Sequence, residues 1–120
     1  MKGLALFLVL LFALSCGGGG SGDESNLNFF LKDPENNGVG LDLQGVSFRG
    51  MELSNANFEN ANLRFADFTN ATLNNVNFVD ADLTEADFTN SFLNNADFVN
   101  ATLTDTDFTD AVTTGATGLD

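Results

Sequence analysis

The feature that most constrains the fold is an apolar residue at every fifth position, without a slip, from Leu43 through to Phe108. These positions, which we call the centres, alternate strictly between Leu and Phe. An amphipathic helix requires apolar spacings of three and four residues, and a half-buried strand requires a spacing of two. A period of five fits neither, so each unit must be a short extended stretch followed by a turn.

The residues around each centre indicate where the chain turns. Two residues before a centre, the chain most often carries Ala, with larger residues such as Leu41, Val46 and Met51 at the N-terminal end. Two residues after a centre, Asn, Asp or Gly fills every place except those of Phe65 and Glu85. These three types adopt the left-handed backbone region at the lowest cost, so we predict a corner at this position.

A second period of twenty residues lies above the first. The sequence ADFTN at residues 66–70 returns at residues 86–90, and ATLNN at 71–75 is followed by SFLNN at 91–95. Four pentapeptides then make one coil, and stacking at about 4.8 Å places residue i on residue i+20. Because Leu and Phe alternate, opposite sides of a coil share a residue type. We therefore predict two Phe walls and two Leu walls around one narrow interior.

The repeat, as in Ala66-Asp67-Phe68, resembles the A(D/N)LXX motif of the pentapeptide-repeat family. The resemblance covers about 70 residues and implies an all-β fold, a right-handed quadrilateral β-helix of about 3.5 coils over residues 41–120. The handedness comes from this resemblance alone.

The two ends of such a solenoid need covering, because unpaired strand edges invite aggregation. For residues 26–40 we predict an N-terminal cap, with a possible short helix that Pro34 would stop. Its apolar residues have helical spacing: Leu27, Phe30 and Leu31.

The C-terminal end is expected to be poorly covered. Residues 111–120 offer only Val112 and Leu119 as bulky side chains. Members of the family often pair through this end, which implies a possible homodimer. The alternative is one more imperfect half-coil that is simply solvated.

The N-terminus predicts export and a lipid anchor. Lys2 precedes an uncharged apolar run at residues 4–14, which is shorter than the about 20 residues that a spanning helix needs. Residues 13–16 (Ala-Leu-Ser-Cys) resemble a bacterial lipobox, with Ala13 and Leu14 in swapped order. The resemblance implies a signal peptide at residues 1–15, an acylated Cys16, and a Gly/Ser-rich tether at 16–25.

This interpretation places the protein in a bacterial cell envelope, attached to the membrane through its lipid (palmitate) anchor only. Gly17, where an Asp would favour the inner membrane, favours the outer membrane if the cell has two. A plain secretory signal with a chance Cys is the alternative.

Charge and composition exclude several classes of function. The formal net charge is −13, with only four Lys and Arg residues, so phosphate backbones are repelled and we expect no direct binding to nucleic acid. His is absent and Cys16 is the single Cys, which removes the commonest general base, thiolate metal clusters and an internal disulfide. We predict no enzyme activity, no cofactor and no dedicated metal site.

The candidate binding face is a ladder of outward carboxylates with neighbouring hydroxyls. Its predicted members are Asp67, Asp87, Asp107, Glu85, Asp105, Thr69, Thr89 and Thr109, with Asp110 at the far corner. Such a ladder could bind a basic partner or Ca²⁺. The alternative is a solvated face whose carboxylates bond to the corners and whose Thr residues pair across strands. Phe65 and Phe92 point outward on different faces, as single exposed apolar residues often do.

The function predicted from these features is a non-enzymatic, membrane-anchored structural or protein-interaction module with an unknown protein partner. The alternative is an acidic DNA-mimic type inhibitor of a DNA-binding enzyme such as gyrase, as some pentapeptide-repeat proteins are. Acidity favours this alternative, whereas export and a rod only about 17 Å long argue against it.

Overall fold

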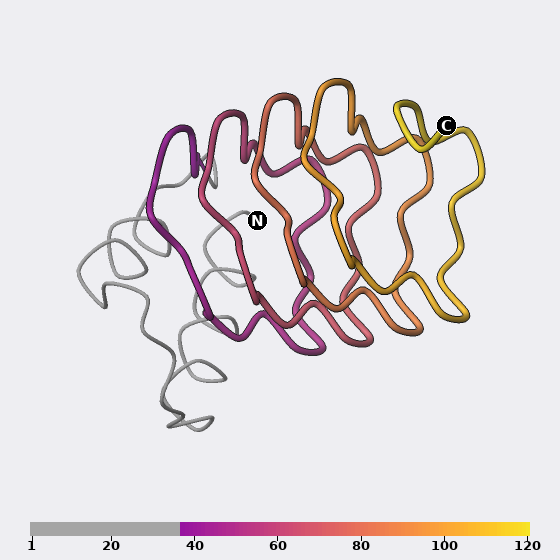
Figure 1. Cartoon of the computed structure of the whole chain (residues 1–120). Helices are drawn as coiled ribbons and strands as arrows, with labels where there is room; N and C mark the ends of the chain where they lie inside the picture. Colours follow the sequence, from indigo (N-terminus) through magenta and orange to yellow (C-terminus); the bar gives the residue numbers. More distant parts are fainter. Residues whose placement is uncertain (1–36) are drawn as a thin grey trace.

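The computed structural model describes residues 37–120, which form a continuous stack of four-sided coils (Figure 1). No helix occurs in this range, and strand pairing consists of isolated parallel bridges, one in each pentapeptide. Every bridge joins residue i to residue i+20, which confirms the predicted twenty-residue coil. One series of bridges runs through Asn37, Asn57, Asn77, Asp97 and Thr117, so the chain passes that side five times. Residues 111–120 continue the pairing.

Several N-terminal predictions lie outside the described residues. These are the signal peptide at 1–15, Cys16 with the tether at 16–25, and the possible helix around Phe30 in the predicted cap. Among residues 37–120, no helix has the length and hydrophobicity that crossing a membrane requires.

We number the four sides of the coil by their centres. From residue 43 to residue 108, sides one and three carry Leu at their centres and sides two and four carry Phe, as the alternation predicted. Side one has centres 43, 63, 83 and 103; side two has 48, 68, 88 and 108; side three has 53, 73, 93 and 113; side four has 38, 58, 78, 98 and 118. The centres outside the alternation are Gly38, Thr113 and Gly118. The residue before each centre makes the bridge and faces outward, and the two residues after it form the corner.

The corners are left-handed, as the residue types predicted. From Gly40 to Gly115 the second corner residue of every repeat has a φ between 55° and 75°, including 59° at Phe65 and 57° at Glu85. A left-handed conformation costs a non-glycine residue about 1–2 kcal/mol, least for Asn and Asp. Phe65 is therefore the most strained of the corner residues.

Backbone hydrogen bonds join each coil to the next. The Phe68 N–H donates to the Asp87 carbonyl at 2.7 Å, and the Asp87 N–H donates back to the Ala66 carbonyl at 3.0 Å. Within the coil, the Ala71 N–H donates to the Phe68 carbonyl at 2.9 Å and closes the turn. This pattern repeats along the stack and satisfies the backbone although no strand is longer than one bridge.

The interior is a column of interlocked Phe rings between two Leu walls. Along side two, Phe68 stacks on Phe48 at 4.9 Å and on Phe88 at 4.8 Å between ring centroids. Rings of sides two and four meet edge to face, for example Phe68 and Phe78 at 5.8 Å. Both arrangements are favourable for aromatic pairs. The rings at the six centres from Phe48 to Phe98 are completely buried, which confirms the predicted Phe walls.

One polar atom lies unpaired in this interior. Ser91 occupies a place held by Ala71 and Ala111 in neighbouring coils, and its side chain is 0% exposed. Its hydroxyl has no hydrogen-bond partner. Burying an unsatisfied hydroxyl costs about 1–3 kcal/mol.

We therefore expect Ser91→Ala to raise the free energy of unfolding by about 1 kcal/mol, measured by chemical denaturation. Ala71→Ser, which places a hydroxyl at the same position one coil earlier, should lower it by a similar amount. A Ser91→Ala protein less stable than the parent would show that the hydroxyl makes a favourable bond.

The two ends of the stack differ in coverage. Leu43 and Phe48 in the first full coil are 0% exposed, whereas Leu103 and Phe108 in the coil of residues 101–120 are only partly buried. The outer edge of that coil, yellow in Figure 1, also leaves backbone N–H groups without a backbone acceptor. They include those of Leu103, Asp105, Phe108, Asp110, Thr113, Gly115 and Gly118.

Candidate binding face

The predicted acidic residues of side two do form one straight column. Bridges join Ser47 to Asp67, Asp67 to Asp87, and Asp87 to Asp107. Asp67 and Asp87 are half-buried and Asp107 is exposed. The column therefore presents three carboxylates at the spacing of successive coils.

One oxygen of each carboxylate is already used by the fold. Oδ1 of Asp67 accepts a hydrogen bond from the Thr69 N–H at 2.8 Å, and the same bond recurs from Thr89 to Asp87 and from Thr109 to Asp107. Such side-chain bonds to a backbone N–H two residues later stabilise turns. The corner role proposed as the alternative is thus real, and it engages Oδ1 of each carboxylate, while Oδ2 of Asp67 lies 3.7 Å from Arg49.

The residues expected beside the column occupy its two corners. Glu85 and Asp105 are the second corner residues between sides one and two, with φ values of 57° and 55°. Asp110 holds the same place between sides two and three, with φ at 57°. All three are exposed.

The three Thr residues do not make one accessible row. Thr69 is 7% exposed, and its hydroxyl is buried without a hydrogen-bond partner. Thr89 is half-buried, while Thr109 is exposed and its hydroxyl donates to Asp107 at 2.6 Å. A partner could contact Thr109 but not Thr69, so a regular hydroxyl array is not available on this face.

Unpaired negative charge dominates the surface. Residues 37–120 contain thirteen Asp and Glu and two Arg, a net side-chain charge of −11. Both cations form ion pairs at the surface, because Arg49 lies 3.7 Å from Asp67 and Arg64 lies 3.4 Å from Asp82. No group of three or more Asp, Glu, Cys or His in this range is placed to hold a metal ion.

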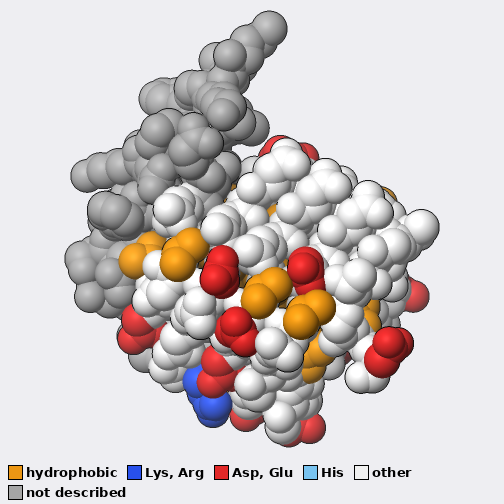
Figure 2. Space-filling view, turned by 90° about the horizontal axis from the view of Figure 1, so that it is seen from above, with side chains coloured by type: hydrophobic (Ala, Val, Ile, Leu, Met, Phe, Trp, Pro, Cys, Tyr) orange, Lys and Arg blue, Asp and Glu red, His pale blue; other side chains and the backbone are white. Residues whose placement is uncertain are grey.

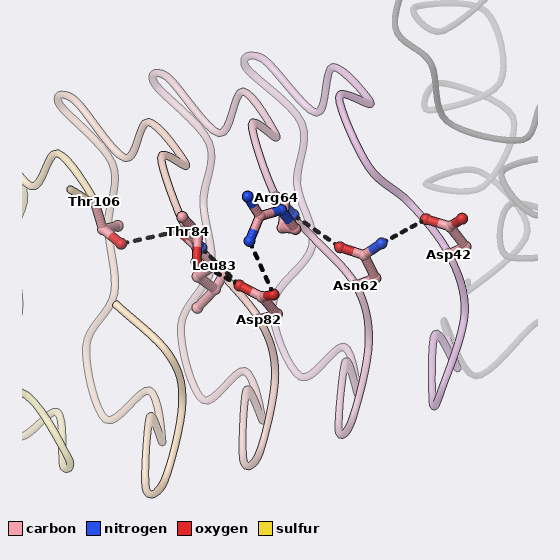
Figure 3. A network of polar contacts seen from close by, with 7 residues as sticks. All are labelled: Asp42, Asn62, Arg64, Asp82, Leu83, Thr84 and Thr106. Atoms are coloured by element: carbon pink, nitrogen blue, oxygen red, sulfur yellow. Dashed lines mark hydrogen bonds and ion pairs between the residues drawn. The ribbon is translucent and has the colours of Figure 1, made fainter. Parts of the chain in front are cut away.

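Side one carries a chain of polar contacts across successive coils (Figure 3). The Asn62 amide donates to Asp42 at 2.9 Å, and its oxygen accepts the Arg64 N–H at 3.3 Å. The Arg64 guanidinium bonds to Oδ2 of Asp82, whose Oδ1 accepts the Thr84 hydroxyl at 2.6 Å. The Arg64 guanidinium also lies 5.4 Å from the centre of the Phe65 ring.

This network lowers the pKa of Asp82. Partial burial alone would raise it, but hydrogen bonds from the Thr84 hydroxyl, the Thr84 N–H and Arg64, together with the Arg64 charge, bring the pKa below its usual value. A carboxyl whose pKa is lowered on folding stabilises the fold above its unfolded pKa, about 3.9. That contribution is lost as pH falls through the lower, folded pKa.

We expect Asp82→Asn to be less stable than the parent at pH 7, by less than about 1 kcal/mol because the ion pair is solvent-exposed. The difference should shrink as pH falls below the folded pKa, where the parent carboxyl is protonated too. Denaturant titrations at a series of pH values measure this, and Arg64→Gln should lose part of the same pH dependence. An equal difference at all pH values would contradict the ion-pair origin.

Several outward apolar residues complete the surface. Phe65 and Phe92, both noted from the sequence, are 44% and 48% exposed and lie on different sides. Val39, Val99 and Val112 are exposed to about the same degree. From the sequence, Val112 was identified only as bulk at the C-terminal end, and Val39 and Val99 were missed. Comparing outward residues at intervals of twenty, instead of five, would have found them.

Comparison with known proteins agrees with this architecture. Residues 40–98 match the family profile described as pentapeptide repeat region. This repeat region belongs to the pentapeptide-repeat family. Members of the family form right-handed quadrilateral β-helices, which supports the predicted fold and its handedness. No curated protein sequence gave a significant match.

Two solved structures of the family are similar to this chain. A pentapeptide-repeat protein from the Arabidopsis thaliana thylakoid lumen is 40% identical, with a TM-score of 0.65, over 66% of this chain and 55% of that one. HetL from the cyanobacterium Nostoc, involved in heterocyst differentiation regulation, is 30% identical, with a TM-score of 0.52, over 62% of this chain and 37% of that one. The chain thus spans about half or less of these relatives.

Proposed function

We propose that the protein is a non-enzymatic, membrane-anchored module for protein–protein interaction in a bacterial envelope. The observation that carries the proposal is that the interior of the solenoid, over residues 43–98, is filled with side chains and has no room for a ligand. Every inward position between Leu43 and Phe98 is closed, mostly by Phe, Leu and Ala. Recognition must therefore use the outer faces, which are polar, acidic and rigidly spaced, or an end of the stack.

Photo-crosslinking tests the interaction itself. A photoreactive residue is introduced at one outward position on each side of the third coil, in the full chain expressed in cells of the source organism. The positions are Asp82, Asp87, Phe92 and Asp97. We expect one or two sides to form a discrete adduct with the same protein, only on irradiation. No adduct from any of the four sides would reject the interaction function.

The lipid anchor is a separate part of the proposal, supported by the lipobox-like residues before Cys16. Metabolic labelling with a palmitate analogue should label the parent chain and not Cys16→Ala. Fractionation of the labelled cells then distinguishes the outer from the inner membrane. Absence of label in both chains would remove the anchor.

Pairing of two copies through the C-terminal end is also proposed. The unpaired N–H groups of residues 101–120 and the half-exposed Phe108 support it, because both gain from a covering surface. Light scattering on the full chain at tens of micromolar should give twice the monomer mass. A strict monomer at that concentration removes the pairing.

Acidic mimicry of DNA is the second candidate function, favoured by the net charge of −11 over the described residues. Similarity to QnrB1, a plasmid-mediated fluoroquinolone resistance protein, is too weak to support it, at 18% identity and a TM-score of 0.20. A gyrase supercoiling assay with the full chain distinguishes the two candidate functions. We expect no inhibition of gyrase, and potent inhibition would favour DNA mimicry over the interaction module.

A further inference from the structure

One corner of the solenoid differs from the other three in carrying apolar side chains at its first position. The first corner residue follows each centre directly, and it is polar throughout sides one to three of residues 37–120. Its apolar members all fall after side four, in one column of successive coils. We call this column the valine corner; it consists of Val39, Glu59, Val79, Val99 and Leu119.

The valine corner lies on the surface. Val39 and Val99 are both 41% exposed, and Val79 and Leu119 are half-buried. By contrast Val46 and Val76, which point inward, are 7% and 1% exposed. Figure 2 views the side on which the chain ends in Figure 1, and it shows hydrophobic side chains in a row among polar and acidic ones.

The fold does not require apolar residues at this corner position. Thr occupies it repeatedly at the other corners, for example Thr89, Thr104 and Thr114, without any break in the stacking. Thr and Val have nearly the same shape, so the coil accepts either. The concentration of Val in one column therefore indicates a use outside the fold.

The column is held rigidly and at a regular spacing. The N–H groups of Val39, Val79 and Val99 each donate to the side chain two residues earlier, at 2.9–3.1 Å. Rings in successive coils lie 4.8–5.4 Å apart, which sets the rise from one residue of the column to the next. A surface fixed before binding loses little conformational entropy when a partner docks.

The charges at and beside the valine corner are negative. Glu59 belongs to the column, Asp80 is the corner residue next to Val79, and Asp97 lies outward on side four two residues before Val99, among uncharged Asn and Thr residues. Neither Arg of residues 37–120 belongs to the corner or to side four, and each is paired with an Asp elsewhere. A partner for this surface must combine an apolar stripe with positive charge on its margins.

We propose that the valine corner binds a cationic amphipathic helix of a partner protein, lying parallel to the solenoid axis. An α-helix advances about 5.4 Å per turn, close to the rise of one coil, so one apolar residue per turn can meet one residue of the column. Lys or Arg beside that stripe would face Asp80 and Asp97. The proposal rests on the interaction function above and names its surface and partner class.

Valine methyl NMR tests the surface directly. The full chain, labelled at valine methyl groups, is titrated with an 18-residue helical peptide that has Leu along one face and Lys on both margins. We expect saturable shifts at Val39, Val79 and Val99. Val112, which is 40% exposed on side three, and the buried Val76 are internal controls that should stay unchanged. A scrambled peptide of the same composition should not saturate.

Substitutions complete the test. Val79→Thr with Val99→Thr should weaken peptide binding at least tenfold, while Phe92→Thr, which removes an exposed ring from side three, should not. Unchanged thermal unfolding shows that the double variant is folded. Equal binding by the scrambled peptide, or by the double variant, would overturn the proposal. So would shifts at these valines with phosphatidylcholine vesicles and none with the peptide, which would indicate a lipid surface.

The two proposals fail in distinguishable ways. If the peptide leaves the valine corner unaffected but crosslinks form on other sides in cells, only the inference about this corner is lost. If no side forms a crosslink, the interaction function is lost, whatever the peptide does.

Discussion

Replacing Phe68 with alanine is expected to lower the free energy of unfolding by about 3–5 kcal/mol, enough to unfold a domain of marginal stability. The Phe68 ring is 0% exposed and stacks between Phe48 and Phe88 at 4.9 and 4.8 Å. It also meets Phe58 and Phe78 edge to face, at 6.0 and 5.8 Å. Its removal leaves a cavity that four rings border, and the bridged coils cannot collapse into it.

The matched control is Phe108→Ala. Phe108 belongs to the same side but stacks only on Phe88, at 5.1 Å, and is partly exposed. We expect less than half the loss seen for Phe68→Ala, because less buried area and a smaller cavity are involved. Denaturant unfolding of both variants, followed by circular dichroism, measures the difference. Equal losses would mean that the last coil is as well covered in solution as the middle ones.

Enlarging a small inward residue should be nearly as damaging. Ala81 is 1% exposed and shares its side with the fully buried Leu83. Between residues 76 and 98 each side holds one large inward residue and one smaller one, so a second Leu has no space beside Leu83. We expect Ala81→Leu to lower the free energy of unfolding by about 1–3 kcal/mol, through displaced rotamers and strained bridges.

The same substitution at the end of the stack gives the control. Ala101 lies one coil after Ala81 in the same column and is only partly buried, and the chain already carries Leu at position 41 of this column. Ala101→Leu should therefore change stability by less than about 0.5 kcal/mol. Thermal unfolding of the two variants side by side distinguishes them. Tolerance of Leu at position 81 would show that the interior is less tightly packed than the ring contacts indicate.

The regular interior could be predicted because it is encoded locally. The period of five, the Asn, Asp or Gly at each corner and the alternation of Leu and Phe give the coil, the left-handed turns and the Phe walls. Phe65 shows the limit of this reasoning. Its residue type disfavours a left-handed φ, yet the hydrogen bonds of the neighbouring coils hold it at 59° like the rest.

The sequence predicted where the candidate binding face lies, but not which of its polar atoms a ligand could reach. The column of Asp67, Asp87 and Asp107 follows from the twenty-residue period. In the structure, one oxygen of each carboxylate accepts a hydrogen bond from a corner N–H, and Thr69 is nearly buried. Both facts depend on the directions of the side chains, which the sequence spacing does not give.

By itself, then, the sequence determined the coil: which residues face inward, where the chain turns, and that each residue lies on the one twenty places before it. Only the tertiary structure decided what the outside offers. It closes the start of the described stack and leaves residues 101–120 open, and it gathers Val39, Val79 and Val99 into one exposed corner. The physical reason is that inward positions are dictated by packing, which repeats, whereas exposure depends on neighbours from other coils.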